Sequence, residues 1–95
     1  MDTIVIDCQK VGDEEGFWQL YLETVRPEGA VFFGRNMAAF WDAISAGGPG
    51  WPGDVELLFI HAEALTSIED GNFLRRLQEI QEQSPQVRVA LSDVT

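Results

Sequence analysis

The stretch Phe-Phe-Gly-Arg-Asn-Met-Ala-Ala-Phe-Trp-Asp-Ala-Ile occupies residues 32–44 and contains an aromatic pair, a glycine turn and a short amphipathic segment. Asn36 is a natural N-cap, because an asparagine side chain can accept hydrogen bonds from the first free backbone amides of a helix. We therefore expect a helix from about Asn36 to Ser45. This helix is the feature from which the rest of the chain can be interpreted.

On this helix, Met37, Phe40 and Ile44 have the i, i+3, i+7 spacing of a buried stripe. Asp42 cannot share that stripe, and Trp41 falls at its edge. The helix is therefore expected to show solvent a carboxylate beside an indole. This combination suits a surface that binds a cationic partner.

Before this stretch, Thr3–Cys8 is a β-branched run typical of a parallel strand covered on at least one face. Asp13 is a plausible N-cap for a helix through about Val25, which the segment 26–29 ends with a proline and a glycine. One face of that helix is expected to carry Phe17, Leu20, Tyr21 and Thr24, with Trp18, Leu22 and Val25 on its flank.

After the helix, residues 46–53 are too rich in glycine and proline to be regular. Val55–Ile60 is nearly all apolar, which predicts a central strand buried on both faces. Val87–Leu91 alternates apolar and polar residues and predicts the last strand.

Between these two strands, His61–Leu65 is expected to form a short helical turn. Ser67–Asp70 matches a capping box, so a longer helix is expected from there to about Gln83, stopped by residues 84–86. Its buried stripe is predicted to contain Phe73, Leu74, Leu77 and Ile80, leaving Arg75, Arg76, Gln78 and Glu79 towards solvent.

The order strand, helices, strand, helices, strand predicts an α/β fold, because parallel strands need helical crossovers. We expect a three-stranded parallel sheet with packed helices, in a single domain over residues 1–95. Cys8 is the only cysteine, which excludes an intramolecular disulfide and fits a reducing compartment.

Sixteen acidic and six basic residues give a net charge of −10. This charge argues against binding to nucleic acid or to an anionic membrane, and it favours attraction of a basic protein. The simpler alternative is an acidic protein whose charge only aids solubility. No apolar run approaches the ~20 residues of a membrane span, the first residues lack the basic start of a signal peptide, and no metal or cofactor motif is present. We expect a cytoplasmic protein without a cofactor.

The segment Phe40–Ile44, with its aromatic-aromatic-Gly-x-Asn lead-in, resembles the barstar family of intracellular inhibitors of secreted ribonucleases. In that family the same turn leads into a helix carrying Leu-Trp-Asp-Ala-Leu. The order of elements is similar over nearly the whole chain. The resemblance implies a barstar-like fold and an inhibitor or immunity protein that blocks the active site of a basic ribonuclease or a related toxin.

The resemblance also implies an interface. Asp42 would enter the ribonuclease active site in place of an RNA phosphate, and Glu79 would contact the enzyme from the long helix. Phe32 stands where the family has a tyrosine that stacks on a catalytic histidine. The full set of expected partner-binding residues is Phe32, Asn36, Ala38, Trp41, Asp42, Ser45, Trp51 and Glu79.

Two positions depart from the family pattern. Ala38 stands where the best-known inhibitors have an acid, and Arg35 falls where the family often has one. Trp51 is expected to substitute for a family aromatic whose place Gly47 takes here.

Two other functions stay open. One is an acidic interaction module with a regulatory, non-nuclease partner, and the other is a small hydrolase using Asp42 and Glu79 as an acid–base pair.

Overall fold

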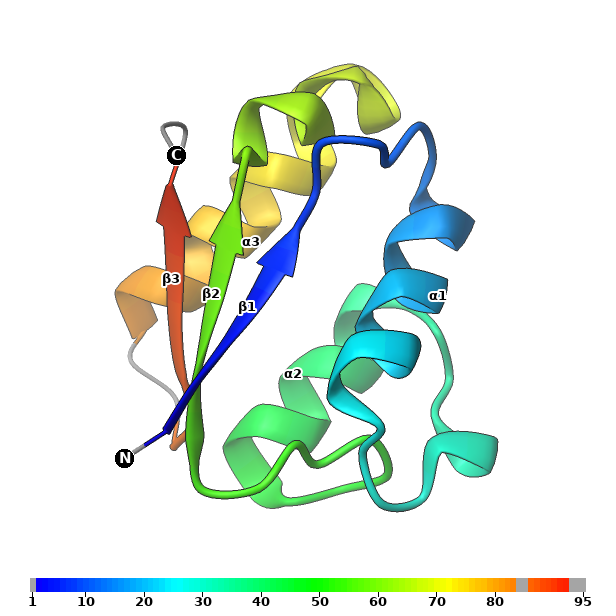
Figure 1. Cartoon of the computed structure of the whole chain (residues 1–95), viewed down its shortest axis with the longest axis vertical. Helices are drawn as coiled ribbons and strands as arrows, with labels where there is room; N and C mark the ends of the chain where they lie inside the picture. Colours follow the sequence, from blue (N-terminus) through cyan, green and yellow to red (C-terminus); the bar gives the residue numbers. More distant parts are fainter. Residues whose placement is uncertain (1, 84–85, 93–95) are drawn as a thin grey trace.

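The computed structural model describes residues 2–83 and 86–92 and is shown in Figure 1. Its elements, in chain order, are β1 (Asp2–Asp7), α1 (Glu14–Val25), the 3₁₀ turn η1 (Ala30–Phe32), α2 (Met37–Ala46), β2 (Val55–Ile60), the 3₁₀ segment η2 (Ala62–Gly71), α3 (Asn72–Gln83) and β3 (Arg88–Ser92). The strands form one parallel sheet in the order β1-β2-β3. The expected α/β fold, with a three-stranded parallel sheet and packed helices, is confirmed.

The helices contact the sheet on the face that carries Phe59. The ring of Phe17 in α1 stacks 5.4 Å from that of Phe59, and Phe40 in α2 lies edge-on at 6.3 Å. In Figure 1, α3 runs behind the strands. The three helices and the sheet therefore enclose one hydrophobic core.

The other face of the sheet carries Val5, Leu58 and Ala90, which stand in register across the three strands. Val5 is 49% exposed, and Leu58 and Ala90 are only half-buried. The prediction that β2 is buried on both faces was therefore wrong. A continuous apolar run cannot distinguish two covered faces from one covered face and one partly open face.

The core is dominated by aromatic rings. Trp18 is its centre, with ring centroids 5.6 Å from Phe33, 5.6 Å from Phe40 and 5.7 Å from Phe73. Its indole N–H donates to Glu14 Oε2 at 3.0 Å, so the one polar atom of the side chain has a partner. The sequence placed Trp18 on the flank of α1, which was wrong.

The buried stripe of α1 is rotated from the expected one. It consists of Phe17, Trp18 and Tyr21, while Thr24, which the sequence placed on the apolar face, is exposed. A weakly amphipathic helix with apolar residues on several sides leaves this choice to packing, and the largest ring occupies the core.

The predicted starts of the first two helices are confirmed. Asp13 Oδ1 accepts from the backbone N–H of Gly16 at 2.7 Å, and Asn36 Oδ1 accepts from that of Ala39 at 2.7 Å. Because each cap has a side-chain oxygen on a free amide, the local sequence alone determines these two boundaries.

The predicted start of the long helix was wrong. Ser67 does not cap a helix, because its hydroxyl donates to the carbonyl of Ala64 at 3.2 Å. Ile68 is extended and buried, and residues 69–71 all have positive φ, so α3 begins only at Asn72. The extended backbone of Ile68 and the left-handed residues after it interrupt any continuous helix from the capping-box position.

The rest of the α3 prediction is confirmed. Phe73, Leu77 and Ile80 are buried, Leu74 is half-buried, and the helix reaches Gln83. The positions Ser84 and Pro85 of the expected stop lie outside the described residues.

Candidate partner-binding site

One strip of α2 faces away from the core. Ala38, Trp41, Asp42 and Ser45 share it because their spacing is i, i+3, i+4 and i+7. Ala38 and Asp42 are exposed, and Trp41 and Ser45 are half-buried. The Ser45 hydroxyl donates to the Trp41 carbonyl at 2.6 Å, so its oxygen keeps only acceptor capacity for another molecule.

The side chain of Asp42 has no hydrogen bond or ion pair to any other residue within 2–83 and 86–92. Its carboxylate lies over the backbone of Gly48, so close that a Cβ atom at that glycine would overlap Asp42 Oδ2. The chain can take this path because Gly47 ends the helix in the left-handed conformation, with φ of 75°. The glycine pair therefore leaves the carboxylate open to solvent and limits where it can lie.

A groove of about 350 Å³ lies between α2 and α3. It is lined by four apolar residues, Met37, Ala38, Trp41 and Ile80, and by three polar ones, Arg76, Glu79 and Gln83. The fold thus brings Glu79, an expected contact residue, next to Ala38 and Trp41 from the other helix.

The turn before α2 exposes two apolar side chains. Phe32 is 79% exposed and Val31 is 91% exposed, whereas Phe33 is buried. The turn is fixed by backbone hydrogen bonds from Phe32 N–H to the Gly29 carbonyl at 2.9 Å and from Phe33 N–H to the Ala30 carbonyl at 3.2 Å. Sequence reasoning missed Val31, because an isolated apolar residue in a turn carries no periodicity.

Asn36 serves the helix itself. Besides its capping oxygen, its side-chain amide donates to the Gly34 carbonyl at 3.2 Å. Both polar ends of the side chain therefore hold the turn against the start of α2. Its observed contacts are therefore those of a helix cap, within the chain itself.

Trp51 lies apart from the groove. It is half-buried against the core and lines a separate cavity of about 270 Å³ with Arg26, Pro27, Glu28, Pro52 and Gly53. The loop is tied down beside it, because the Tyr21 hydroxyl donates to the Gly50 carbonyl at 2.8 Å and Gly50 N–H donates to the Glu28 carbonyl at 3.1 Å. Burial raises the pKa of Tyr21, so this hydroxyl stays a donor.

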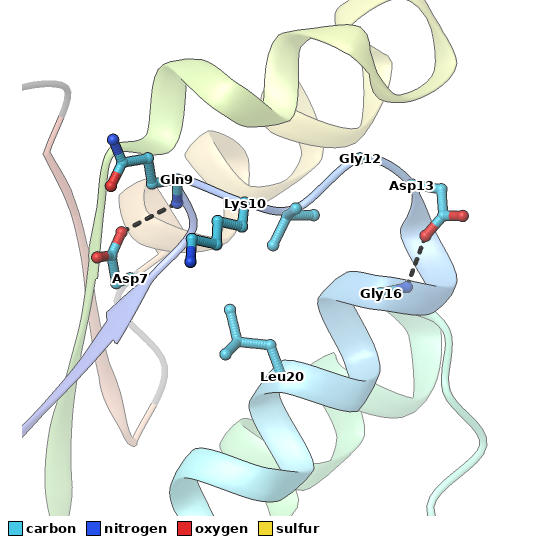
Figure 2. A pocket seen from close by; sticks show the side chains of 8 residues that line it. Asp7, Gln9, Lys10, Gly12, Asp13, Gly16 and Leu20 are labelled. Carbon is cyan, nitrogen blue, oxygen red and sulfur yellow. Dashed lines mark hydrogen bonds between the residues drawn. The ribbon is translucent and has the colours of Figure 1, made fainter.

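A larger cavity, of about 510 Å³, lies where β1 leads into α1. Figure 2 shows Lys10 and Leu20 pointing into it from the loop and from the helix. Its two carboxylates already accept from backbone amides, Asp7 from Gln9 at 2.9 Å and Asp13 from Gly16 at 2.7 Å. The two carboxylates hold the loop in shape, and among the residues that line this cavity none is paired as a nucleophile and base would be.

Within residues 2–83 and 86–92, no three His, Cys, Asp or Glu side chains come together as metal ligands would. In the same part of the chain no helix combines the length and apolarity needed to cross a bilayer.

His61, directly after β2, has a left-handed backbone, and its Nδ1 atom lies 3.4 Å from Glu63 Oε1.

The structure is that of a small α/β protein in which one face of α2 is open to solvent and carries a carboxylate with no partner among the described residues. The family model described as barstar (barnase inhibitor) matches residues 1–92. The chain therefore belongs to the barstar family, whose members are inhibitors rather than enzymes. A search of curated proteins found no match.

Proposed function

We propose that this protein inhibits a basic ribonuclease related to barnase by covering the active site of the enzyme with the exposed strip of α2. The observation that supports this most directly is the unpaired carboxylate of Asp42, exposed beside half-buried Trp41 on a chain of net charge −10. Inhibition would take place in the cytoplasm, where the enzyme would otherwise degrade the RNA of the cell.

The chemistry of the proposed contact is that of phosphate mimicry. A ribonuclease active site holds cationic side chains that bind the RNA phosphate, and a carboxylate offers guanidinium groups a planar bidentate acceptor. Within the described residues the Asp42 side chain has no partner to give up, so binding would cost its desolvation but no internal contact. The net negative charge would also speed the encounter with a basic enzyme.

The neighbouring residues would complete the contact. Glu79, across the groove from Trp41, would bind a second cation, and the exposed ring of Phe32 would stack on an active-site side chain. Asn36 would orient α2, and Ser45 would accept a hydrogen bond at the far end of the strip. We also retain as contact positions Ala38, within the strip, and Trp51, in the loop that follows α2.

The experiment is a titration of barnase with this protein, read both by calorimetry and by residual ribonuclease activity. The test variant is Asp42→Asn, which removes the charge at constant size. The matched control is Glu82→Gln, which removes one charge from an exposed position of α3 that does not line the groove.

We expect Asp42→Asn to weaken binding by about 30-fold or more, which corresponds to about 2 kcal/mol. The stability of the protein should change by less than about 0.5 kcal/mol, because the side chain is exposed. Glu82→Gln should change the affinity by less than about threefold. Equal losses for both variants would mean that only the net charge matters and that Asp42 has no special role.

The departures at Arg35 and Ala38 favour a second candidate, an acidic interaction module with a regulatory partner that is not a nuclease. Both residues are exposed, Ala38 within the strip and Arg35 in the turn before it. The best-known inhibitors have an acid at the first position, and the family often has one at the second. Capture of partners from the source cell and its secreted fraction distinguishes the two functions. A captured basic ribonuclease supports inhibition, and a captured protein without nuclease activity supports the module.

A further inference from the structure

We propose that the groove between α2 and α3 takes an aliphatic side chain of the target ribonuclease, next to a carboxylate of the same enzyme that pairs with Arg76. This inference rests on the proposed function and specifies which ribonucleases the surface accepts. The enzyme would be basic at the site that meets Asp42 and would carry an acid beside an aliphatic residue where it meets the groove.

Four of the residues that line the groove are apolar. Met37 and Trp41 are half-buried, Ile80 is 6% exposed, and Ala38 leaves open the space that a longer side chain would fill. A volume of about 350 Å³ is at the lower end of the ~300–1,000 Å³ typical of small-ligand pockets, which suits one or two side chains. Filling it would remove apolar surface of both proteins from water.

Arg76 supplies a positive charge to the lining of the groove. Its side chain is exposed at the rim and has no hydrogen bond or ion pair with any described residue. A guanidinium beside an apolar wall repels an incoming lysine or arginine and binds a carboxylate in a bidentate manner. Among the residues that line the groove Arg76 is the one cation, on a chain whose net charge is −10.

Glu79 shares the rim one helical turn after Arg76. The rim therefore presents a positive group and a negative group in a fixed order along α3. A partner segment fits only if its own charges run in the complementary order, which makes this surface selective as well as adhesive.

The test uses a yeast-displayed library of catalytically inactivated barnase, in which the residues around the active-site cleft are randomised in adjacent pairs. The library is sorted for binding to four purified proteins: the wild type, Arg76→Glu, Arg75→Glu and Asp42→Asn. Arg75→Glu is the matched control, because Arg75 is an exposed neighbour on α3 that does not line the groove.

We expect the wild-type sort to enrich Asp or Glu beside Leu, Ile or Met at one pair of positions. The Arg76→Glu sort should replace that acid by Lys or Arg, and the wild-type clones should bind Arg76→Glu about tenfold or more weakly. Their affinity for Arg75→Glu should stay within about twofold of the wild-type value.

The inference is overturned if the wild-type, Arg76→Glu and Arg75→Glu sorts enrich the same residues. It is also overturned if the wild type enriches Lys or Arg at the barnase position whose preferred residue changes in the Arg76→Glu sort. Either of these two outcomes can occur together with loss of binding between the wild-type clones and Asp42→Asn. In that case only the groove inference fails, and the proposed function stands. If no library member binds the wild type, both fail.

Discussion

Replacement of Gly48 by alanine tests whether the path of the chain after α2 positions the Asp42 carboxylate. The glycine has no side chain where the Asp42 oxygen lies, and an added methyl group would overlap Oδ2. The backbone of Gly48 also donates to the Asp42 carbonyl at 3.3 Å, so the two residues are held together at the end of the helix. The methyl group must therefore move the carboxylate.

The expected effect on stability is small. The displaced group is the end of an exposed side chain, and holding such a side chain about 30° away from a rotamer costs about 0.5–1.5 kcal/mol. Because Gly48 has no positive φ, alanine also restricts the unfolded chain and returns about 0.4–1 kcal/mol. The free energy of unfolding should thus stay within about 1 kcal/mol of the wild-type value.

The expected effect on binding is larger. If Asp42 contributes about 2 kcal/mol or more to ribonuclease affinity, a misplaced carboxylate should lose about 1–2 kcal/mol, a five- to thirtyfold weakening. In the Asp42→Asn background the same alanine should change the affinity by less than about 0.5 kcal/mol, since the group it displaces no longer carries a charge.

The assay is a double-mutant cycle by calorimetry with barnase, together with urea unfolding of each variant. Gly12→Ala is the matched control, because a Cβ atom there meets nothing within 4 Å and the loop lies away from α2. Equal losses from Gly48→Ala in both backgrounds, or a loss of several kcal/mol of stability, would refute the positioning role.

Two further changes remove hydrogen bonds that hold the site, one changes the charge of its surface, and one prediction concerns the Cys8 thiol. Tyr21→Phe should lower the free energy of unfolding in urea by about 1–2 kcal/mol, because it leaves the carbonyl of the glycine-rich loop without its buried donor. Asn36→Ala should cost about 1 kcal/mol in the same assay through loss of the helix cap, whereas Asn36→Asp should largely restore it. Ala38→Asp combined with Arg35→Glu should raise the affinity for barnase at low salt, and calorimetry should show the gain shrinking at about 0.15 M salt, where the Debye length is about 8 Å. Burial raises the pKa of Cys8 to about 12, so iodoacetamide should modify the native protein only as fast as it unfolds. The free energy of unfolding in urea should also decline as the pH rises above about 8.5, because the thiol of the unfolded chain then ionises. Rapid alkylation of the native protein at neutral pH would contradict this.

The sequence by itself determined the elements whose signals are local. Asp13 and Asn36 predict helix starts because a cap needs only its own side chain and the next three amides. The three strand segments followed from short β-rich runs, and parallel pairing followed from the helices between them. Asp42 was predicted to be exposed, and it is, because an aspartate cannot share the apolar stripe of a helix.

The tertiary structure decided what depends on contacts between distant segments. It selected Trp18 as the centre of the core, left one face of the sheet partly open, and delayed the start of α3 until after buried Ile68. It also placed Arg76 beside Ala38 and so made a groove from two helices. Each of these outcomes depends on how the helices and sheet share one core, and periodicity within a single segment carries no information about its neighbours.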